Sequence, residues 1–178
     1  MKKCLIPLEE KTMNKIEIEL LNTEQKIAEY IARSRTKTNR AAGIKNLKAG
    51  PQSSEETELE GVASELAAAK ILNVWPDLDT SKASVEDFTF RGYTIDVKTT
   101  KYLTGRLLLP LYKKDKACDY YILMVGSFPK YKCMGFAAKK DLINDDKIGT
   151  LGNYKNYMLE QNELKTLEEF LNETKARA

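Results

Sequence analysis

Apolar positions recur every three to four residues in two stretches of the first half of the chain, which is the spacing of an amphipathic helix. The first stretch covers residues 22–35, and the second covers residues 57–73 and opens on the capping box TELE at residues 57–60. Residues 36–54 contain two glycines, a proline and two serines. This composition predicts a mobile connector between the two helices.

From residue 85 onward apolar positions alternate with polar ones, and a period of two predicts β-strands. Arg91 and Gly92 separate two such segments and form a predicted two-residue hairpin turn. The predicted elements are strands over residues 85–90, 93–99, 105–112, 119–125 and 131–137, a short helix over 138–144 and a last helix from Asn162. This order predicts an α/β fold with a mixed central β-sheet flanked by helices. Residues 1–54 would form an N-terminal helical extension with a basic connector, and residues 55–178 the core.

The composition limits the chemistry that the protein can perform. The chain has 178 residues, 42% of them apolar, with a formal net charge of +3, and this length suits one domain with a buried core. Histidine is absent, which excludes histidine-based triads and histidine zinc sites. The cysteines Cys4, Cys118 and Cys133 form no Cys-x-x-Cys pair, so we expect buried apolar thiols rather than disulfides or cysteine-bound metals. Catalysis would have to rest on carboxylates, lysines or hydroxyl groups, assisted by a hard metal ion.

No segment of the sequence predicts insertion into a membrane. The apolar runs are far shorter than the ~20 residues of a membrane-spanning helix. At the N-terminus the chain reaches Glu9 before the apolar region of a signal peptide forms. We therefore expect a cytoplasmic protein without a membrane partner.

The predicted hairpin brings two aspartates together. With the turn at residues 91–92, Asp87 faces Asp96 across the two strands, and Lys98 points to the same side as Asp96. Directly opposed like charges are destabilising, and a divalent cation would remove the repulsion, because Mg²⁺ binds one or two carboxylates together with water and phosphate oxygens. Taken alone, an Asp-x-Lys pattern is also typical of the solvent-exposed face of a sheet.

Three segments carry a resemblance to a known family. They are GVASE at residues 61–65 of the second helix, Asp87-Phe88 in the first hairpin strand, and IDVKTT at residues 95–100 in the second. Together they resemble the PD-(D/E)xK nuclease superfamily, whose core is restriction-endonuclease-like, and the resemblance covers roughly residues 57–137. Glu86 stands where the proline of the motif would be, and residues 101–118 are strand-like where the family has a helix.

The resemblance implies a Mg²⁺-dependent deoxyribonuclease that hydrolyses phosphodiester bonds by metal-activated water, with Mn²⁺ as a substitute. It implies Asp87 and Asp96 as metal ligands, joined by the Val97 carbonyl. Lys98 would orient or deprotonate the attacking water or stabilise charge on the phosphate, and Glu65 would hold a metal-bound water or bind a second ion. An endonuclease is favoured over an exonuclease, and restriction, recombination, repair and phage or mobile-element roles all stay open.

Basic residues flank these segments, and lysine and arginine contacts to phosphates give affinity without sequence preference. The candidate nucleic-acid contacts are Arg33, Arg35, Lys37, Arg40, Lys45, Lys48, Thr100, Lys101, Arg106, Lys113 and Lys114. The expected partner is nucleic acid, with DNA favoured, and a homodimer would allow both strands to be reached. Two alternatives stay open: a noncatalytic nucleic-acid-binding module on a nuclease-like scaffold, and a protein-interaction domain whose charged segments serve a partner.

Overall fold

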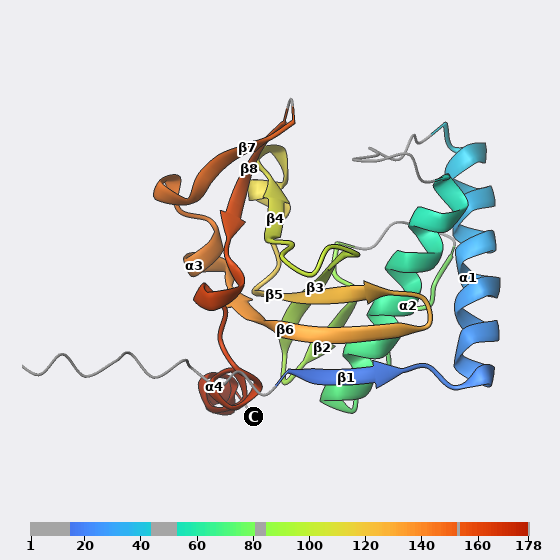
Figure 1. Ribbon diagram of the computed structural model, residues 1–178, viewed down its shortest axis with the longest axis horizontal. Helices are drawn as coiled ribbons and strands as arrows, with labels where there is room; N and C mark the ends of the chain where they lie inside the picture. Colours follow the sequence, from blue (N-terminus) through green and yellow to red (C-terminus); the bar gives the residue numbers. More distant parts are fainter. Residues whose placement is uncertain (1–14, 44–52, 81–84, 153, 178) are drawn as a thin grey trace, which may run out of the picture.

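The central feature of the computed structural model is a five-stranded mixed sheet (Figure 1). The model describes residues 15–43, 53–80, 85–152 and 154–177. The strands of the sheet, in the order β1-β6-β5-β3-β2, are β1 (Ile16–Glu19), β6 (Lys130–Ala138), β5 (Tyr120–Ser127), β3 (Tyr93–Thr100) and β2 (Phe88–Phe90). Strands β3 and β5 are parallel, and the other neighbours are antiparallel. The prediction of an α/β fold with a mixed sheet flanked by helices is confirmed.

Two long helices form a layer beside this sheet. Helix α2 (Ser54–Leu72) packs against the strands, and α1 (Asn22–Ala41) runs alongside α2 (Figure 1). The first core fills the space between helices and sheet, and its fully buried members include Ala28, Val62, Ala63, Ala67, Ile95, Ile122, Met124 and Phe170. The small alanines of α2 allow the helix to approach the sheet closely, which holds the side chains of α2 at the level of β3.

A second, three-stranded sheet packs against the face of the central sheet that lies opposite α1 and α2. Its order is β4 (Leu107–Pro110), β8 (Tyr154–Leu159), β7 (Ile148–Leu151). Leu107, Leu109 and Leu159 from this sheet meet Tyr121 and Leu123 of β5 in a second core. The remaining short elements are the 3₁₀ helices η1 (Leu111–Lys116), η2 (Asp145–Lys147), η3 (Gln161–Glu163) and η4 (Thr174–Arg177), with helices α3 (Lys139–Leu142) and α4 (Leu167–Glu173).

The two N-terminal helices differ from their predicted limits. Helix α1 continues to Ala41 instead of ending near residue 35, because Thr36 is buried against the core and Asn39 Nδ2 donates to Glu58 Oε1 of α2 at 3.0 Å. The predicted mobile connector over residues 36–54 is therefore wrong in its first part, while residues 44–52 lie outside the described residues. Helix α2 begins one turn earlier than predicted, because the capping box is formed by Ser53 and Glu56.

The N-terminal part of the chain contributes to the same packing unit as the rest. Strand β1, which the sequence did not predict, pairs with β6, and Ile31 and Ala32 of α1 join the first core. The predicted N-terminal extension therefore supplies one strand of the sheet and one layer of the core. Among the described residues, no helix combines the length and the apolar character needed to cross a membrane.

The connection between β3 and β5 departs from the predicted arrangement. The expected strand over residues 105–112 is shortened to Leu107–Pro110 and belongs to the second sheet, not to the central one. Pro110 has no N–H for a further ladder bond, and the chain continues as η1. The parallel crossover thus runs through β4 and a 3₁₀ helix, where the resemblance to the nuclease superfamily predicts an α-helix. The restriction-endonuclease-like core stays a prediction.

Candidate functional site

The hairpin of β2 and β3 has the predicted turn. Phe90 pairs with Tyr93 and Phe88 with Ile95, so that Arg91 and Gly92 form the two-residue turn with positive φ angles of 51° and 75°. Arg91 accepts this conformation because its guanidinium is anchored, with Nη1 donating to the Leu171 carbonyl at 2.9 Å. The register on which the candidate site depends is confirmed up to Phe88.

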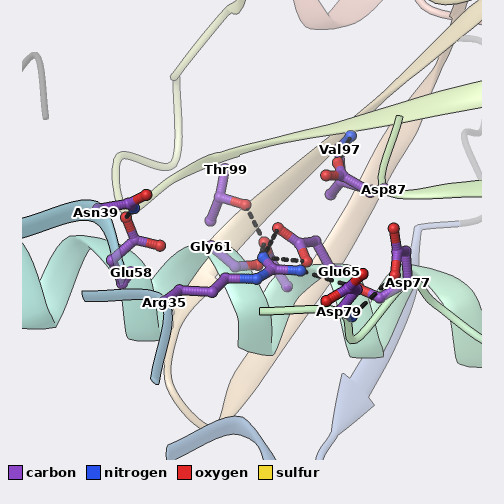
Figure 2. Close-up of polar contacts among 11 residues, drawn as sticks. Arg35, Asn39, Glu58, Gly61, Glu65, Asp77, Asp79, Asp87, Val97 and Thr99 are labelled. Atoms are coloured by element: carbon purple, nitrogen blue, oxygen red, sulfur yellow. Dashed lines mark hydrogen bonds and ion pairs between the residues drawn. The ribbon is translucent and has the colours of Figure 1, made fainter. Parts of the chain in front are cut away.

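At Asp87 the backbone leaves the regular ladder. Its amide donates to the carbonyl of Ile95 at 2.9 Å, although Ile95 is the register partner of Phe88 and not of Asp87. Strand β2 begins only at Phe88, and the Asp87 carboxylate fills the position beyond it: Oδ2 accepts a hydrogen bond from the Val97 amide at 2.6 Å. Asp87 therefore lies beside Val97 at the edge of β3 (Figure 2). The sequence predicted that it faces Asp96 directly across two paired strands, whereas the pairing of β2 with β3 ends at Phe88.

Asp96 and Lys98 lie on one face of β3 and form an ion pair with each other. Their neighbours in the parallel register are Tyr121 and Leu123 of β5, which belong to the second core. The side chains are only 13% and 23% exposed. Because little water reaches this ion pair, the surrounding side chains hold it in place. Asp96 and Lys98 lie on the same face of β3, which confirms their predicted shared orientation.

Glu65 reaches the same region from the other side of β3. It lies on α2, is 8% exposed, and its two carboxylate oxygens accept hydrogen bonds from Arg35 Nη1 of α1 at 2.9 and 3.1 Å (Figure 2). Arg35 Nη2 also donates to the Asp77 carbonyl at 2.9 Å. Arg35 was predicted as a phosphate contact on a basic arm. This prediction is corrected: its guanidinium is held inside the protein by Glu65 and Asp77.

Burial and mutual repulsion shape the ionisation of the carboxylates. The pKa of Asp87 is raised well above its usual value, first because burial disfavours the charged form and then because Glu65 and Asp96 are negatively charged neighbours. Burial also raises the pKa of Glu65, and the Arg35 guanidinium opposes this rise. Asp87 thus lies close enough to Glu65 and Asp96 for their negative charges to repel its own. This arrangement is unfavourable without additional positive charge.

The donor set fits a hard cation held by few protein ligands. Over residues 15–43, 53–80, 85–152 and 154–177, no three His, Cys, Asp or Glu side chains gather in a cluster that could hold a metal by themselves. Asp87 and Asp96 offer carboxylate oxygens, and Val97 between Asp96 and Lys98 offers a carbonyl oxygen. Mg²⁺ needs only one or two carboxylates and completes its shell with water and phosphate oxygens. The residues present therefore suit Mg²⁺ or Mn²⁺ bound jointly with a substrate.

The remaining predicted contacts are spread over several elements. On α1, Arg33 pairs with Glu29 and Arg40 with Glu55 on the exposed surface, and Lys37 is exposed. Lys45 and Lys48 lie outside the described residues. Beyond β3, Arg106 Nε pairs with Glu160 at 2.6 Å and the Thr100 hydroxyl accepts from the Tyr102 amide, while Lys101, Lys113 and Lys114 are exposed. In the part that the structure describes, the predicted basic arm belongs to helix α1. Of its basic residues there, only Arg33, Lys37 and Arg40 face solvent.

Sequence reasoning missed the role of Arg35, although a signal was present. Arg35 follows the buried Ala28 by seven residues and Ile31 by four, so it lies on the packed face of α1. Thr99 follows the strand alternation: it points away from Asp96 and donates to the Ser64 hydroxyl on α2. Cys118 and Cys133 are both buried, as expected, and burial raises the pKa of the Cys118 thiol to about 12.

Comparison of the chain with protein-family models, curated proteins and solved structures found no significant match.

Proposed function

We propose that the protein is a metal-dependent nuclease of the PD-(D/E)xK type that hydrolyses phosphodiester bonds of DNA. The observation that carries the proposal is the juxtaposition at the edge of β3, where the Asp87 carboxylate binds the Val97 amide beside the Asp96–Lys98 ion pair. Carboxylates that repel one another in a poorly hydrated place favour binding of a divalent cation. A lysine next to them suits a reaction whose transition state gains negative charge.

Each residue of the site would have its own role in binding the metal ion and the phosphate. Asp87, Asp96 and the Val97 carbonyl would hold Mg²⁺, which when bound supplies Lewis acidity toward water and phosphate. Lys98 lies on a long side chain anchored by Asp96. As an ammonium group it would donate a hydrogen bond to a phosphate oxygen, and as a neutral amine it would instead accept a proton from the attacking water. The exposed lysines Lys101, Lys113 and Lys114 would contact neighbouring phosphates of the same strand.

The test is cleavage of supercoiled plasmid, end-labelled linear duplex and a matched RNA in Mg²⁺, in Mn²⁺ and in EDTA. We expect cutting of DNA only with a metal ion, nicked or linear plasmid as the first product of an endonuclease, and loss of cutting in Asp96→Asn and Lys98→Ala. Wild-type rates in both folded variants would refute the proposal.

Two other outcomes would replace the proposal. Salt-sensitive binding of DNA that survives EDTA, with no cleavage in any metal, would identify a noncatalytic nucleic-acid-binding module. Absence of any DNA shift at moderate salt, together with a discrete protein complex in light scattering, would identify an interaction domain. The same light-scattering measurement on the protein alone tests the proposed homodimer.

A further inference from the structure

The contact between Arg35 and Glu65 supplies the candidate site with a fixed cation of its own. The guanidinium binds both oxygens of Glu65 and, with its other nitrogen, the Asp77 carbonyl. One nitrogen, Nη1, lies within hydrogen-bond distance of both carboxylate oxygens, and the bonds are charge-assisted because donor and acceptor are ionised. The side chains of Arg35 and Glu65 are 21% and 10% exposed, so solvent screens the pair weakly. Glu65 has its positive partner before any metal arrives.

Arg35 cannot leave Glu65 without loosening the helix layer. It projects from α1 one turn beyond the buried Ile31 and Ala32, and one turn before Asn39, which binds Glu58 of α2. The guanidinium is therefore held by the packing of α1 on α2 as well as by its hydrogen bonds. A lysine would bring the same charge but has a single nitrogen, so it could not bind Glu65 through one nitrogen and the Asp77 carbonyl through another.

The charges of the site balance with one divalent ion. The two negative neighbours of Asp87, Glu65 and Asp96, are each paired with a cation, Arg35 and Lys98. The charge of Asp87 itself has no such cation among the described residues, and a single divalent ion with one phosphate group cancels it. A second divalent ion would leave two excess positive charges in a poorly hydrated place, which is unfavourable.

We propose that Arg35 occupies the second cation position of the site, so that the protein binds one divalent ion at Asp87 and Asp96. Glu65 is then a positioning residue that acts through Arg35, and not a metal ligand. This inference rests on the proposed nuclease function, because that function places the first ion at the two aspartates. It replaces the expectation that Glu65 binds a metal-bound water or a second ion.

The test is the number of Mn²⁺ ions bound per chain, measured by isothermal titration calorimetry and by electron paramagnetic resonance on the full-length protein. We expect one ion for the wild type and one for Glu65→Gln. We expect two for Arg35→Met, which frees the Glu65 carboxylate, and one for Arg35→Lys. In cleavage assays the dependence of rate on metal concentration should change from a Hill coefficient near 1 to one near 2 in Arg35→Met.

The matched control is Lys70→Met. Lys70 of α2 pairs with Glu24 of α1 at 2.9 Å, so this variant removes another ion pair between the same two helices, away from Asp87 and Asp96. It should keep one ion. If Arg35→Met fails to fold, as judged by circular dichroism, the wild type and Glu65→Gln still decide the question.

The outcomes separate this inference from the function on which it rests. Two ions in the wild type, loss of an ion in Glu65→Gln, or a single ion in folded Arg35→Met would overturn the role of Arg35 and leave the nuclease proposal intact. No Mn²⁺ bound to the wild type, with and without a DNA oligonucleotide, would overturn the metal-dependent function itself and the inference with it.

Discussion

Two glutamates of helix α2, Glu60 and Glu65, have surroundings that differ in kind. Glu60 accepts hydrogen bonds from the Phe128 amide at 3.0 Å and from the Tyr131 hydroxyl at 2.6 Å, which fastens the β5–β6 hairpin to the helix. Both of these donors are neutral groups. Glu65 is bound by a guanidinium and feels the charges of Asp87 and Asp96.

The difference separates a structural carboxylate from those of a candidate site. Burial and the adjacent Glu60 raise the pKa of Tyr131, which keeps its hydroxyl protonated and able to donate. Around Glu65, Asp87 and Asp96 the negative charges outnumber the positive ones. This arrangement becomes favourable only when another cation is added. A buried polar network that is satisfied by its own members stabilises a fold, whereas one that is left with excess charge indicates a ligand.

The largest effect is expected where the excess charge lies. Lys98→Ala and Asp96→Ala should each reduce DNA cleavage by about 10²- to 10⁴-fold, the range for loss of a positioned proton-transfer or charge-stabilising group. Steady-state cleavage at several Mg²⁺ concentrations measures the loss, with circular dichroism as the check on folding. Lys132→Ala on β6 of the same sheet, where Lys132 pairs with the exposed Glu17, should cleave like the wild type. Equal losses in all three variants would show that Asp96 and Lys98 of β3 have no specific role in cleavage.

The structural glutamate should show the opposite behaviour. Glu60→Ala leaves the Phe128 amide and the Tyr131 hydroxyl without their acceptor, and we expect a loss of about 2 to 4 kcal/mol in the free energy of unfolding. Urea denaturation measures this loss. Cleavage per folded molecule and Mn²⁺ affinity should stay at wild-type levels. If folded Glu60→Ala loses its activity instead, the division between the two glutamates fails.

The ionisation of Asp87 predicts a pH dependence in the absence of metal. Its pKa in the folded protein lies above the unfolded value, so the folded state holds the proton more tightly. The contribution of Asp87 to stability is therefore fully present at pH values below its pKa in the unfolded chain. It is lost as the pH rises through its pKa in the folded protein. At neutral pH and in EDTA we expect Asp87→Asn to have a higher free energy of unfolding than the wild type, because the variant buries no charge at this position.

Added Mg²⁺ should reverse this order, because the wild type gains stability from binding and Asp87→Asn does not. Thermal denaturation across pH 4 to 8, with and without Mg²⁺, makes the comparison. An Asp87→Asn protein that is less stable than the wild type in EDTA at neutral pH would show that the carboxylate is already compensated.

The smallest effect is expected at the exposed lysines. Lys113 and Lys114 are exposed on η1, and removing both should lower the slope of log affinity against log salt by about 2, since each phosphate contact contributes about 0.9. Fluorescence anisotropy of a labelled duplex at increasing salt gives the slope. Lys139→Ala on α3 removes another exposed lysine and serves as the control. An unchanged slope in the double variant would place the nucleic acid elsewhere.

Much of the framework could be predicted from the sequence, because its signals are local. The turn at Arg91-Gly92, the alternation that separates Asp96 and Lys98 from Thr99, and the apolar strand that became β5 all depend on neighbouring residues. Strands β1, β7 and β8 were missed. They are short, and β8 combines lysine and asparagine with its apolar residues, so that only pairing with β4 and β7 makes it a strand.

By itself, the sequence determined the alternation on β3 and the absence of histidine, and so it limited the candidate chemistry to carboxylates and a lysine at one hairpin. Only the tertiary structure decided that Asp87 lies at the edge of β3 and that Arg35 belongs to Glu65, thirty positions away along the chain. The reason is physical: alternation and turn geometry act between adjacent residues, whereas the partner of a buried charge is selected by the packing of whole helices against a sheet.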